Sequence, residues 1–152
     1  MEKITDIKLT DQLCFSIYNA NRLFSKFYQK ALEPYQLTYT QYIVLLTLWE
    51  EGCTTLNQLS KELDLASNTL TPLLKRLEKA GWLTRCRVKK DQRQLQIQLT
   101  EKGRKQKAAI EQSLENCVDE QIGMTFETYQ RMLADNQKLI NELKSYLEVK
   151  AD

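Results

Sequence analysis

The stretch LTRCRVKKDQRQLQIQLT, residues 83–100, changes the periodicity of the chain. On either side of it, apolar residues recur every three or four positions, which is the spacing of an amphipathic helix. Within it, Leu83 and the residues that follow alternate with a period of two, and Leu95, Ile97 and Leu99 alternate with glutamines. A period of two is typical of a strand. The stretch therefore predicts a β-hairpin with residues 89–93 at its tip, and it is the only strand content that we predict.

Helices are predicted on both sides of the hairpin. The first covers residues 9–33 and ends at Pro34, because proline disfavours helical geometry in the residue before it. Thr55 and Gln58 fit a capping box at the start of a short helix that ends in a break at residues 64–66. The other helices are predicted over residues 40–51, 67–80, 101–122 and 125–149. Pro72 suits only the opening turn of a helix, so the helix over residues 67–80 is expected to start nearer Thr69.

This order of elements predicts a mainly α fold with a β-hairpin wing, a winged helix-turn-helix. We expect one domain over residues 1–152, with the DNA-binding part at about 40–100. The helices at about 9–33 and 102–149 are expected to form a dimer. Apolar residues in the last helix follow spacings of 3 and 4 over three heptads, which favours assembly with another helix.

Composition excludes several classes of protein. The 152 residues contain no histidine, which excludes Ser-His-Asp catalysis and most zinc hydrolases. No 18-residue apolar run occurs, so neither a membrane span nor a signal peptide is expected. The four cysteines are 39, 33 and 31 residues apart without a CxxC pair, which favours a cytoplasmic protein with free thiols and no metal or cofactor.

Charge is concentrated around the hairpin. Residues 75–107 carry a local charge of +9, and the rest of the chain carries −7. A basic block of this kind indicates a polyanion, and double-stranded DNA is the partner that fits a helix and a wing. The predicted DNA-binding residues are Ser67, Asn68, Thr69, Thr71, Lys75, Arg76, Lys89, Lys90 and Arg93. The alternative is that the Ser/Thr cluster only caps a helix and that the basic residues form a solvated face.

Two motifs resemble the MarR family of dimeric transcription regulators. The wing motif of that family matches Asp91-Gln92-Arg93, followed by a strand and Leu99-Thr100-Glu101-Lys102-Gly103. The resemblance implies that Arg93 enters the minor groove of a palindromic operator and that Asp91 holds an arginine of the wing in place. The stretch from Leu70 to Glu78 is similar to the recognition helix of the family.

The N-terminal segment resembles the OhrR branch, which senses organic hydroperoxides. The matching residues are Gln12-Leu13-Cys14-Phe15, Tyr28 and the run Leu37-Thr38-Tyr39-Thr40-Gln41-Tyr42. The resemblance implies a homodimeric repressor, not an enzyme, in which Cys14 reacts with the oxidant and Tyr28 and Tyr39 hydrogen-bond to its thiolate. By the same resemblance, Cys117 of the other subunit forms a disulfide with Cys14, and DNA is released. Ala66-Ser67-Asn68 departs from the pattern of the branch, so the base contacts stay open.

Geometry adds one constraint to this interpretation. Cys14 and Tyr28 are 14 residues apart, which is about 21 Å along one straight helix. Tyr28 is therefore expected to serve the Cys14 of the partner subunit. The alternatives are that Cys14 is a small buried hydrophobe, that the tyrosines only pack, and that Cys117 is a plain interface residue. Cys53, at a helix end, and Cys86, in the hairpin, are interpreted as structural.

Three other functions stay open. A MarR-type regulator with structural cysteines would bind a small aromatic ligand between its first and second helices. A thiol peroxidase would use Cys14 catalytically, but the chain lacks the alternating strands of a thioredoxin-like scaffold. A coiled-coil adaptor would explain residues 125–149 but not the wing.

Overall fold

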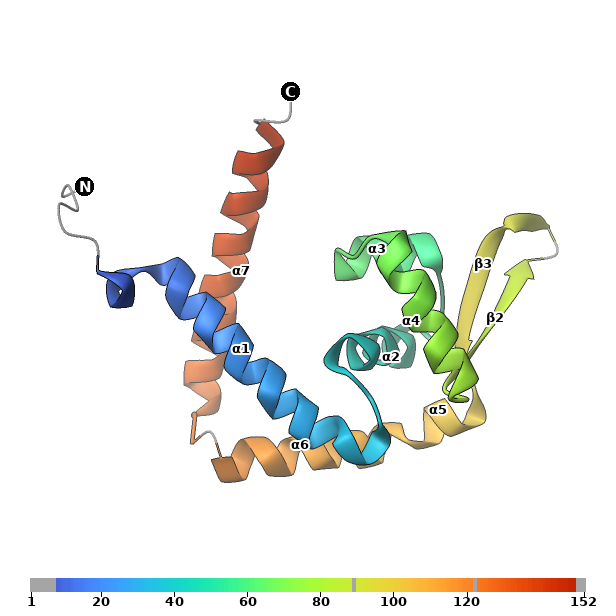
Figure 1. Cartoon of the computed structure of the whole chain (residues 1–152), viewed down its shortest axis with the longest axis horizontal. Coiled ribbons are helices and arrows are strands. Elements are labelled where there is room, and N and C mark those ends of the chain that lie inside the picture. The colour runs from blue at the N-terminus through green and yellow to red at the C-terminus, as the bar shows by residue number, and fades with distance from the viewer. Residues whose placement is uncertain (1–7, 89, 122, 150–152) are drawn as a thin grey trace. The chain divides into compact units, whose positions relative to one another are not determined.

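The computed structural model describes residues 8–88, 90–121 and 123–149, without the side chains of residues 91–93, 118–121 and 149. The described chain is mainly helical with one small sheet, which confirms the predicted fold class (Figure 1). The elements are η1 (Leu9–Asp11), α1 (Leu13–Leu32), η2 (Glu33–Tyr35), α2 (Tyr39–Glu51), β1 (Cys53–Thr55), α3 (Leu56–Leu63), α4 (Ser67–Lys79), β2 (Leu83–Val88), β3 (Asp91–Leu99), α5 (Glu101–Lys105), α6 (Lys107–Gln121) and α7 (Phe126–Val149).

Two compact units make up the chain, Met1–Ser113 and Leu114–Asp152. The first unit holds every element up to the start of α6, and the second holds the rest of α6 and α7. Among the described residues, no helix is both long and apolar enough to cross a membrane.

The helix-turn-helix is built by local capping. The hydroxyl of Thr55 accepts a hydrogen bond from the Gln58 amide at 3.3 Å, and the Gln58 side chain accepts one from the Thr55 amide at 3.1 Å, so the predicted capping box is confirmed. A second capping box, at Thr38 and Gln41, starts α2 one residue earlier than predicted. Between α3 and α4, Asp64 adopts a left-handed conformation (φ 52°), which makes the turn at the predicted break.

The start of α4 differs from the prediction. The helix begins at Ser67, not near Thr69, and Pro72 therefore lies inside it. Proline has no amide hydrogen, so the carbonyl of Asn68 loses its helical partner. Pro72 is exposed, which leaves water free to hydrate that carbonyl, and the helix continues to Lys79.

The sheet has three antiparallel strands in the order β1-β3-β2, so the prediction of a lone hairpin is wrong. A three-residue strand is too short to show a period of two. Gly52, with φ 78°, ends α2. Cys53 is therefore not at a helix end as predicted, but begins β1, where it pairs with Gln98. The tip is also shorter than residues 89–93, because β3 already begins at Asp91, opposite Val88.

The outer helices differ from their predicted bounds in two places. Gln12 is extended, so α1 begins at Leu13 and a separate 3-10 turn precedes it. The predicted helix over residues 101–122 is two helices, α5 and α6, which meet at Gln106, and residue 122 lies outside the described residues. Predicted residues 125–149 correspond to α7.

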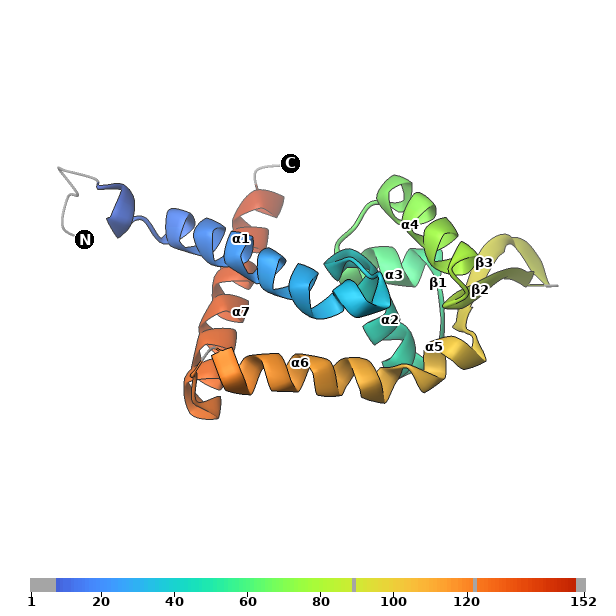
Figure 2. The same cartoon turned by 60° about the horizontal axis from the view of Figure 1, so that its bottom comes forward.

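Apolar side chains from α2, α3, α4, β2 and β3 form the core of the first unit. The side chains with at most 1% exposure include Leu45, Leu48, Leu59, Leu70, Leu74, Leu77, Leu83 and Ile97. Removing such side chains from water is the main stabilising term of the unit. This core fixes α4 and the hairpin side by side, with one face of α4 left for solvent (Figure 2).

Candidate functional site

The first turn of α4 presents small polar side chains to solvent. Ser67, Asn68 and Thr69 are exposed, and Ala66 is the N-cap residue, with no side-chain hydrogen bond to the helix end. The cluster therefore does not serve as a helix cap, contrary to the alternative weighed above. The hydroxyl of Thr71 differs, because it donates to the carbonyl of Ser67 at 2.8 Å and is half-buried.

Basic side chains flank this turn. Lys75 and Arg76 are exposed on the next turn of α4, and Lys90 is exposed between the two strands of the hairpin. Lys89 and the side chains of Asp91 and Arg93 lie outside the described residues, although the backbone of β3 includes Asp91 and Arg93. A helix N-terminus with exposed donors and a basic rim suits DNA, whose phosphates are anionic and whose base edges accept hydrogen bonds.

An ion pair connects the helix to the wing, and sequence reasoning missed it. The Glu78 carboxylate in α4 accepts hydrogen bonds from Nη2 and Nε of Arg85 in β2, at 2.7 and 2.9 Å. The Arg85 guanidinium holds the pKa of the Glu78 carboxyl below its usual value. The two elements that would meet DNA are thus held in one orientation.

The Leu-Thr-x-x-Gly motif brings two chain segments together at the base of the wing. We call this contact, between residues 81–82 and residues 100–103, the crossing. The hydroxyl of Thr100 donates to the carbonyl of Gly81 at 2.6 Å and accepts from the Gly103 amide at 3.1 Å. A side chain on Gly103 would overlap the carbonyl oxygen of Trp82, so only glycine fits there. The Trp49 indole donates to the carbonyl of Gly103 at 2.9 Å, which brings α2 to the same crossing.

The cysteines are free thiols at four separate places in the fold. Cys14 is exposed in the first turn of α1, so it does not fill a core position in its own unit. Cys117 is half-buried in α6, in the second unit. Cys53 is half-buried on β1, and Cys86 is exposed on β2.

Tyrosines gather where α1 meets α2. The rings of Tyr28 and Tyr39 lie 4.5 Å apart. Tyr42, which was not predicted to contact the thiolate, stacks on Tyr28 at 5.9 Å. Burial raises the pKa of the Tyr42 hydroxyl, and the carboxylates of Glu111 and Glu50 raise it further. Cys14 and Tyr28 lie 14 residues apart on α1, which runs as one helix from Leu13 to Leu32.

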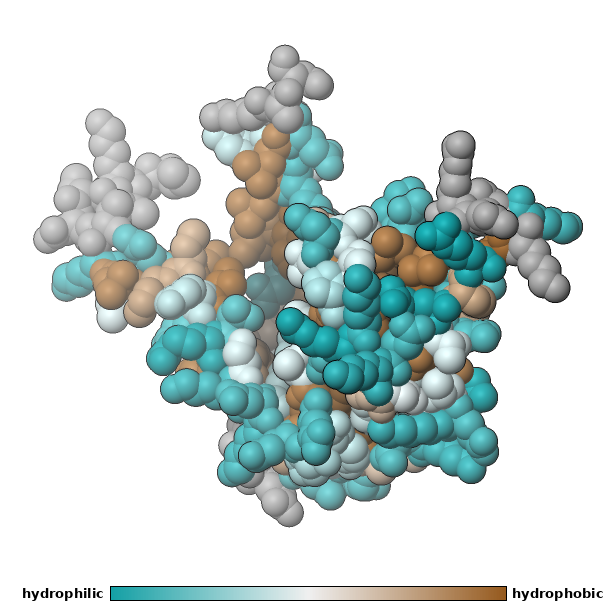
Figure 3. Space-filling model, turned by 45° about the vertical axis from the view of Figure 1, so that its right-hand side comes forward, coloured by the Kyte–Doolittle hydropathy of each residue, from teal (hydrophilic) through white to brown (hydrophobic). Residues whose placement is uncertain are grey.

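Two helices expose apolar faces. In α1, Leu13, Ile17, Tyr18 and Phe24 are exposed, with Leu13 at 60%. In α7, the exposed apolar residues are Phe126, Tyr129, Met132, Leu133, Ile140, Leu143, Tyr146 and Leu147, with Phe126 at 76%. In the space-filling view, apolar surface runs along α7 below the C-terminus (Figure 3). Apolar surface of this extent marks an interaction site.

Comparison with known proteins assigns the family. The family described as transcriptional regulator SarA/Rot matches residues 26–110, more than half of the chain. The chain belongs to the SarA/Rot family. A SarA/Rot protein is a transcriptional regulator, so the expectation that the chain is not an enzyme is confirmed.

Two curated relatives of this SarA/Rot protein are transcriptional regulators. The organic hydroperoxide resistance transcriptional regulator of Bacillus subtilis is 44% identical over 101 residues, which cover 66% of this chain and 69% of that protein. The HTH-type transcriptional regulator TtmR of Methylorubrum extorquens is 44% identical over 84% of this chain. The chain spans 65% of the length of TtmR.

Solved structures agree with the predicted MarR-like winged helix. A structure of reduced AbfR bound to DNA is 46% identical over 91% of this chain and 94% of that one, with a TM-score of 0.84. AbfR from Staphylococcus epidermidis is also 46% identical, with a TM-score of 0.77. AbfR has further been solved overoxidised and bound to DNA, and in a disulfide form. The predicted resemblance to the OhrR-like branch of MarR regulators is confirmed.

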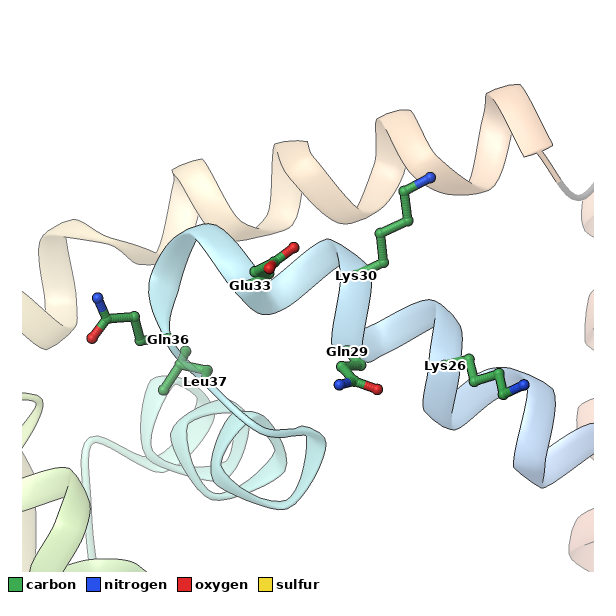
Figure 4. Close-up of a pocket in the computed structure, with 6 residues that line it drawn as sticks. All are labelled: Lys26, Gln29, Lys30, Glu33, Gln36 and Leu37. Atoms are coloured by element: carbon green, nitrogen blue, oxygen red, sulfur yellow. The ribbon is translucent and has the colours of Figure 1, made fainter.

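A surface pocket lies near the end of α1. It is a pocket of about 480 Å³ lined by Lys26, Gln29, Lys30, Glu33, Gln36 and Leu37, of which only Leu37 is apolar (Figure 4). Tyr28, Tyr39 and Tyr42, which lie between α1 and α2, pack on one another and do not line this pocket.

Proposed function

We propose that this SarA/Rot protein is a homodimeric, cytoplasmic DNA-binding repressor that senses organic hydroperoxides through Cys14. The observation that carries the DNA-binding part is the exposed, uncapped first turn of α4 beside a wing that Glu78 and Arg85 hold in place. Asn68 and its neighbours would contact base edges in the major groove, and Lys75 and Arg76 would neutralise phosphates. The wing tip, with Lys89, Lys90, Asp91 and Arg93, would reach the backbone or the minor groove.

A second copy of the chain is the occupant that the apolar faces of α1 and α7 require. Two copies related by a two-fold axis would place two α4 helices on a palindromic operator. A dimer would also explain how Tyr28 could reach a Cys14 thiolate. Tyr28 lies about 21 Å along α1 from Cys14 of its own chain, so its hydroxyl would serve the partner's thiolate.

The proposed chemistry balances without a cofactor. The Cys14 thiolate attacks the distal oxygen of the hydroperoxide, the O–O bond breaks, and an alcohol leaves after protonation. Cys14 becomes a sulfenic acid, and the peroxide is reduced. A thiol of the partner subunit, Cys117, then attacks the Cys14 sulfur and releases water, which forms an intersubunit disulfide. Tyr28 and Tyr39 would orient the thiolate by donating hydrogen bonds to it.

We assign the release of DNA to the disulfide rather than to oxidation of the Cys14 sulfur. AbfR has been solved overoxidised and bound to DNA, so overoxidation does not by itself prevent that protein from binding DNA. A bond between subunits, by contrast, constrains how the two α4 helices are spaced. Operator binding depends on that spacing, because half-sites recur at multiples of one helical turn.

The test treats the wild type, Cys14→Ser and Cys117→Ser with cumene hydroperoxide. Non-reducing electrophoresis with peptide mass mapping follows the cysteines, and fluorescence anisotropy follows binding to a duplex enriched by the reduced protein from a random-sequence pool. We expect a covalent Cys14–Cys117 dimer and loss of binding only in the wild type. Cys117→Ser should accumulate oxidised Cys14 and keep its affinity for the duplex.

Two results would contradict the proposal. A covalent dimer that still forms in Cys117→Ser would exclude Cys117 as the partner of Cys14. Unmodified Cys14 in the wild type would exclude redox sensing and leave the DNA-binding dimer as the function.

A further inference from the structure

A continuous series of aromatic rings extends from the tyrosine cluster along α2. Tyr39 contacts Tyr28 at 4.5 Å, Tyr28 stacks on Tyr42 at 5.9 Å, and Tyr42 contacts Trp49 at 6.3 Å. Tyr42 is only 9% exposed, and Trp49 is half-buried. Three of the rings lie on α2, from its first residue, Tyr39, to Trp49 in its last turn.

The series ends in a hydrogen bond to the base of the wing. Trp49 Nε1 donates to the carbonyl of Gly103 at 2.9 Å. Gly103 in turn lies so close to the carbonyl of Trp82 that no side chain would fit between them. Trp82 directly precedes β2, and Thr100, which follows β3, accepts from the Gly103 amide. Both strands of the wing therefore start or end at this crossing.

We propose that Trp49 is a positioning residue that transmits the state of the sensing tyrosines to the wing. The proposal rests on the proposed redox function and names the route by which it acts within one subunit. Tyr28 and Tyr39 change partners when the thiolate becomes a disulfide. A shift of Tyr28 would displace the Tyr42 ring that stacks on it, and Tyr42 would displace Trp49. The hydrogen bond from Trp49 would then carry the displacement to Gly103.

A route of this kind predicts a specific separation of effects. Sensing would survive without Trp49 Nε1, because that atom lies at the far end of the series from the thiol. Binding of DNA by the reduced dimer would also survive, because the α4–wing ion pair does not involve Trp49. Only the loss of DNA affinity on oxidation would shrink. A merely structural role would change stability and leave that loss as it is.

The experiment compares the wild type, Trp49→Phe and Tyr35→Phe as full-length dimers. Trp49→Phe keeps a ring and removes the indole donor. Tyr35→Phe is the matched control, since it also keeps a ring and removes a 2.9 Å hydrogen bond to a carbonyl, that of Ala109. Three quantities are measured: the rate of Cys14 oxidation by cumene hydroperoxide, the urea midpoint, and the affinity for the pool-enriched duplex before and after oxidation.

The expected result is a coupling defect in one variant. Trp49→Phe should oxidise at the wild-type rate but lose about tenfold less affinity on oxidation than the wild type does, within the usual range of allosteric coupling. Tyr35→Phe should lose as much affinity on oxidation as the wild type. An unchanged affinity loss in Trp49→Phe would overturn the role of Trp49, whereas an inert Cys14 in the wild type would overturn the redox function itself.

A second measurement covers the case in which Trp49→Phe does not fold. Trp49 and Trp82 are the two tryptophans of the chain, so Trp82→Phe leaves Trp49 as the sole indole emitter. Its emission should shift when Cys14 is oxidised, because the indole hydrogen bond and the neighbouring Tyr42 ring are displaced. Identical emission spectra before and after complete oxidation would exclude transmission through Trp49.

Discussion

Among the described residues, Glu78 of α4 and Arg85 of β2 form the only ion pair between the recognition helix and the wing. The Glu78 carboxylate accepts from Nη2 of Arg85 at 2.7 Å, from Nε at 2.9 Å and from the Arg85 amide at 3.3 Å. Two charge-assisted bonds to one guanidinium fix orientation as well as distance. The pair therefore sets the angle at which α4 and β2 would approach one duplex.

Replacing Glu78 with Gln should weaken DNA binding more than it weakens the fold. The pair is partly exposed, so its loss should cost about 0.5–1 kcal/mol in the free energy of unfolding. Affinity for the pool-enriched duplex, measured by anisotropy, should fall further because the wing loses its orientation. Glu101→Gln is the matched control: it makes the same charge change in an exposed pair with Lys105. Equal affinities in the two variants would contradict a positioning role for Glu78.

The same pair predicts a pH dependence of stability. The Arg85 guanidinium lowers the pKa of the Glu78 carboxyl below its usual value of 4.5. A lowered pKa in the folded state means that the stabilisation is complete above 4.5 and is lost as the pH falls below it. Urea unfolding should thus separate the wild type from Glu78→Gln at neutral pH, and the difference should shrink as the pH falls below 4.5. A difference that stays constant over this range would show that the pair does not lower the pKa.

Periodicity predicted the fold because each long element repeats its own spacing. The change from a spacing of three or four to two located the wing, and the capping residues Thr55 and Gln58 located the start of α3 within a residue. Short elements lack such repeats. β1 has three residues and pairs with β3 across 43 positions of sequence, so nothing local predicts it. Pro72 misled the prediction of α4 because its cost depends on whether the affected carbonyl faces water.

The candidate site was predictable in its residue types but not in its connections. Polar residues at a helix start and tyrosines near a cysteine carry a chemical meaning that sequence shows. The ion pair of Glu78 with Arg85, and the hydrogen bond of Trp49 to Gly103, join residues whose partners depend on how elements pack. Glu78 and Trp49 do not stand out by residue type, because a glutamate on a helix and a tryptophan on an apolar helix are both ordinary.

Gly103→Ala should destabilise the first unit even though it lies in a helix. Alanine in a helix is ordinarily favoured over glycine by about 1 kcal/mol. Here the new methyl group would overlap the carbonyl oxygen of Trp82 and press on Leu99. We expect a loss of about 1–3 kcal/mol, the usual range for overpacking, measured by urea unfolding. Gly52→Ala is the comparison: its φ of 78° is strained for alanine but the space is open, so it should cost less.

Two residues of α4 should affect DNA binding in different ways. Lys75→Ala should weaken binding to all duplexes and reduce the slope of log affinity against log salt by about 1, because one phosphate contact is lost. Asn68→Ala should leave the slope unchanged and reduce the preference for the enriched duplex over a scrambled one. Anisotropy titrations at several salt concentrations measure both. If Asn68→Ala changed the salt slope and kept the sequence preference, Asn68 would face phosphate instead.

The apolar face of α7 has one polar residue at its centre. Asn136 interrupts a series with spacings of 3 and 4 that is otherwise apolar and exposed: Phe126, Tyr129, Leu133, Ile140, Leu143 and Leu147. In paired helices, a single buried asparagine reduces stability and fixes the register. If α7 packs against a second copy, Asn136→Leu should strengthen the dimer by about 2 kcal/mol for each of its two subunits, the value of one buried leucine, and allow assemblies larger than a dimer.

Sedimentation equilibrium over a dilution series measures both effects of that substitution. Asn141→Leu is the matched control, because Asn141 lies five residues further along α7, off the apolar series, where it accepts a hydrogen bond from Gln137 at 3.2 Å. The control should leave the dissociation constant of the dimer as it is, since its side chain points away from the proposed partner. A gain of the same size in both variants would mean that added hydrophobicity alone drives association, and no gain at Asn136 would place the dimer contact on another face.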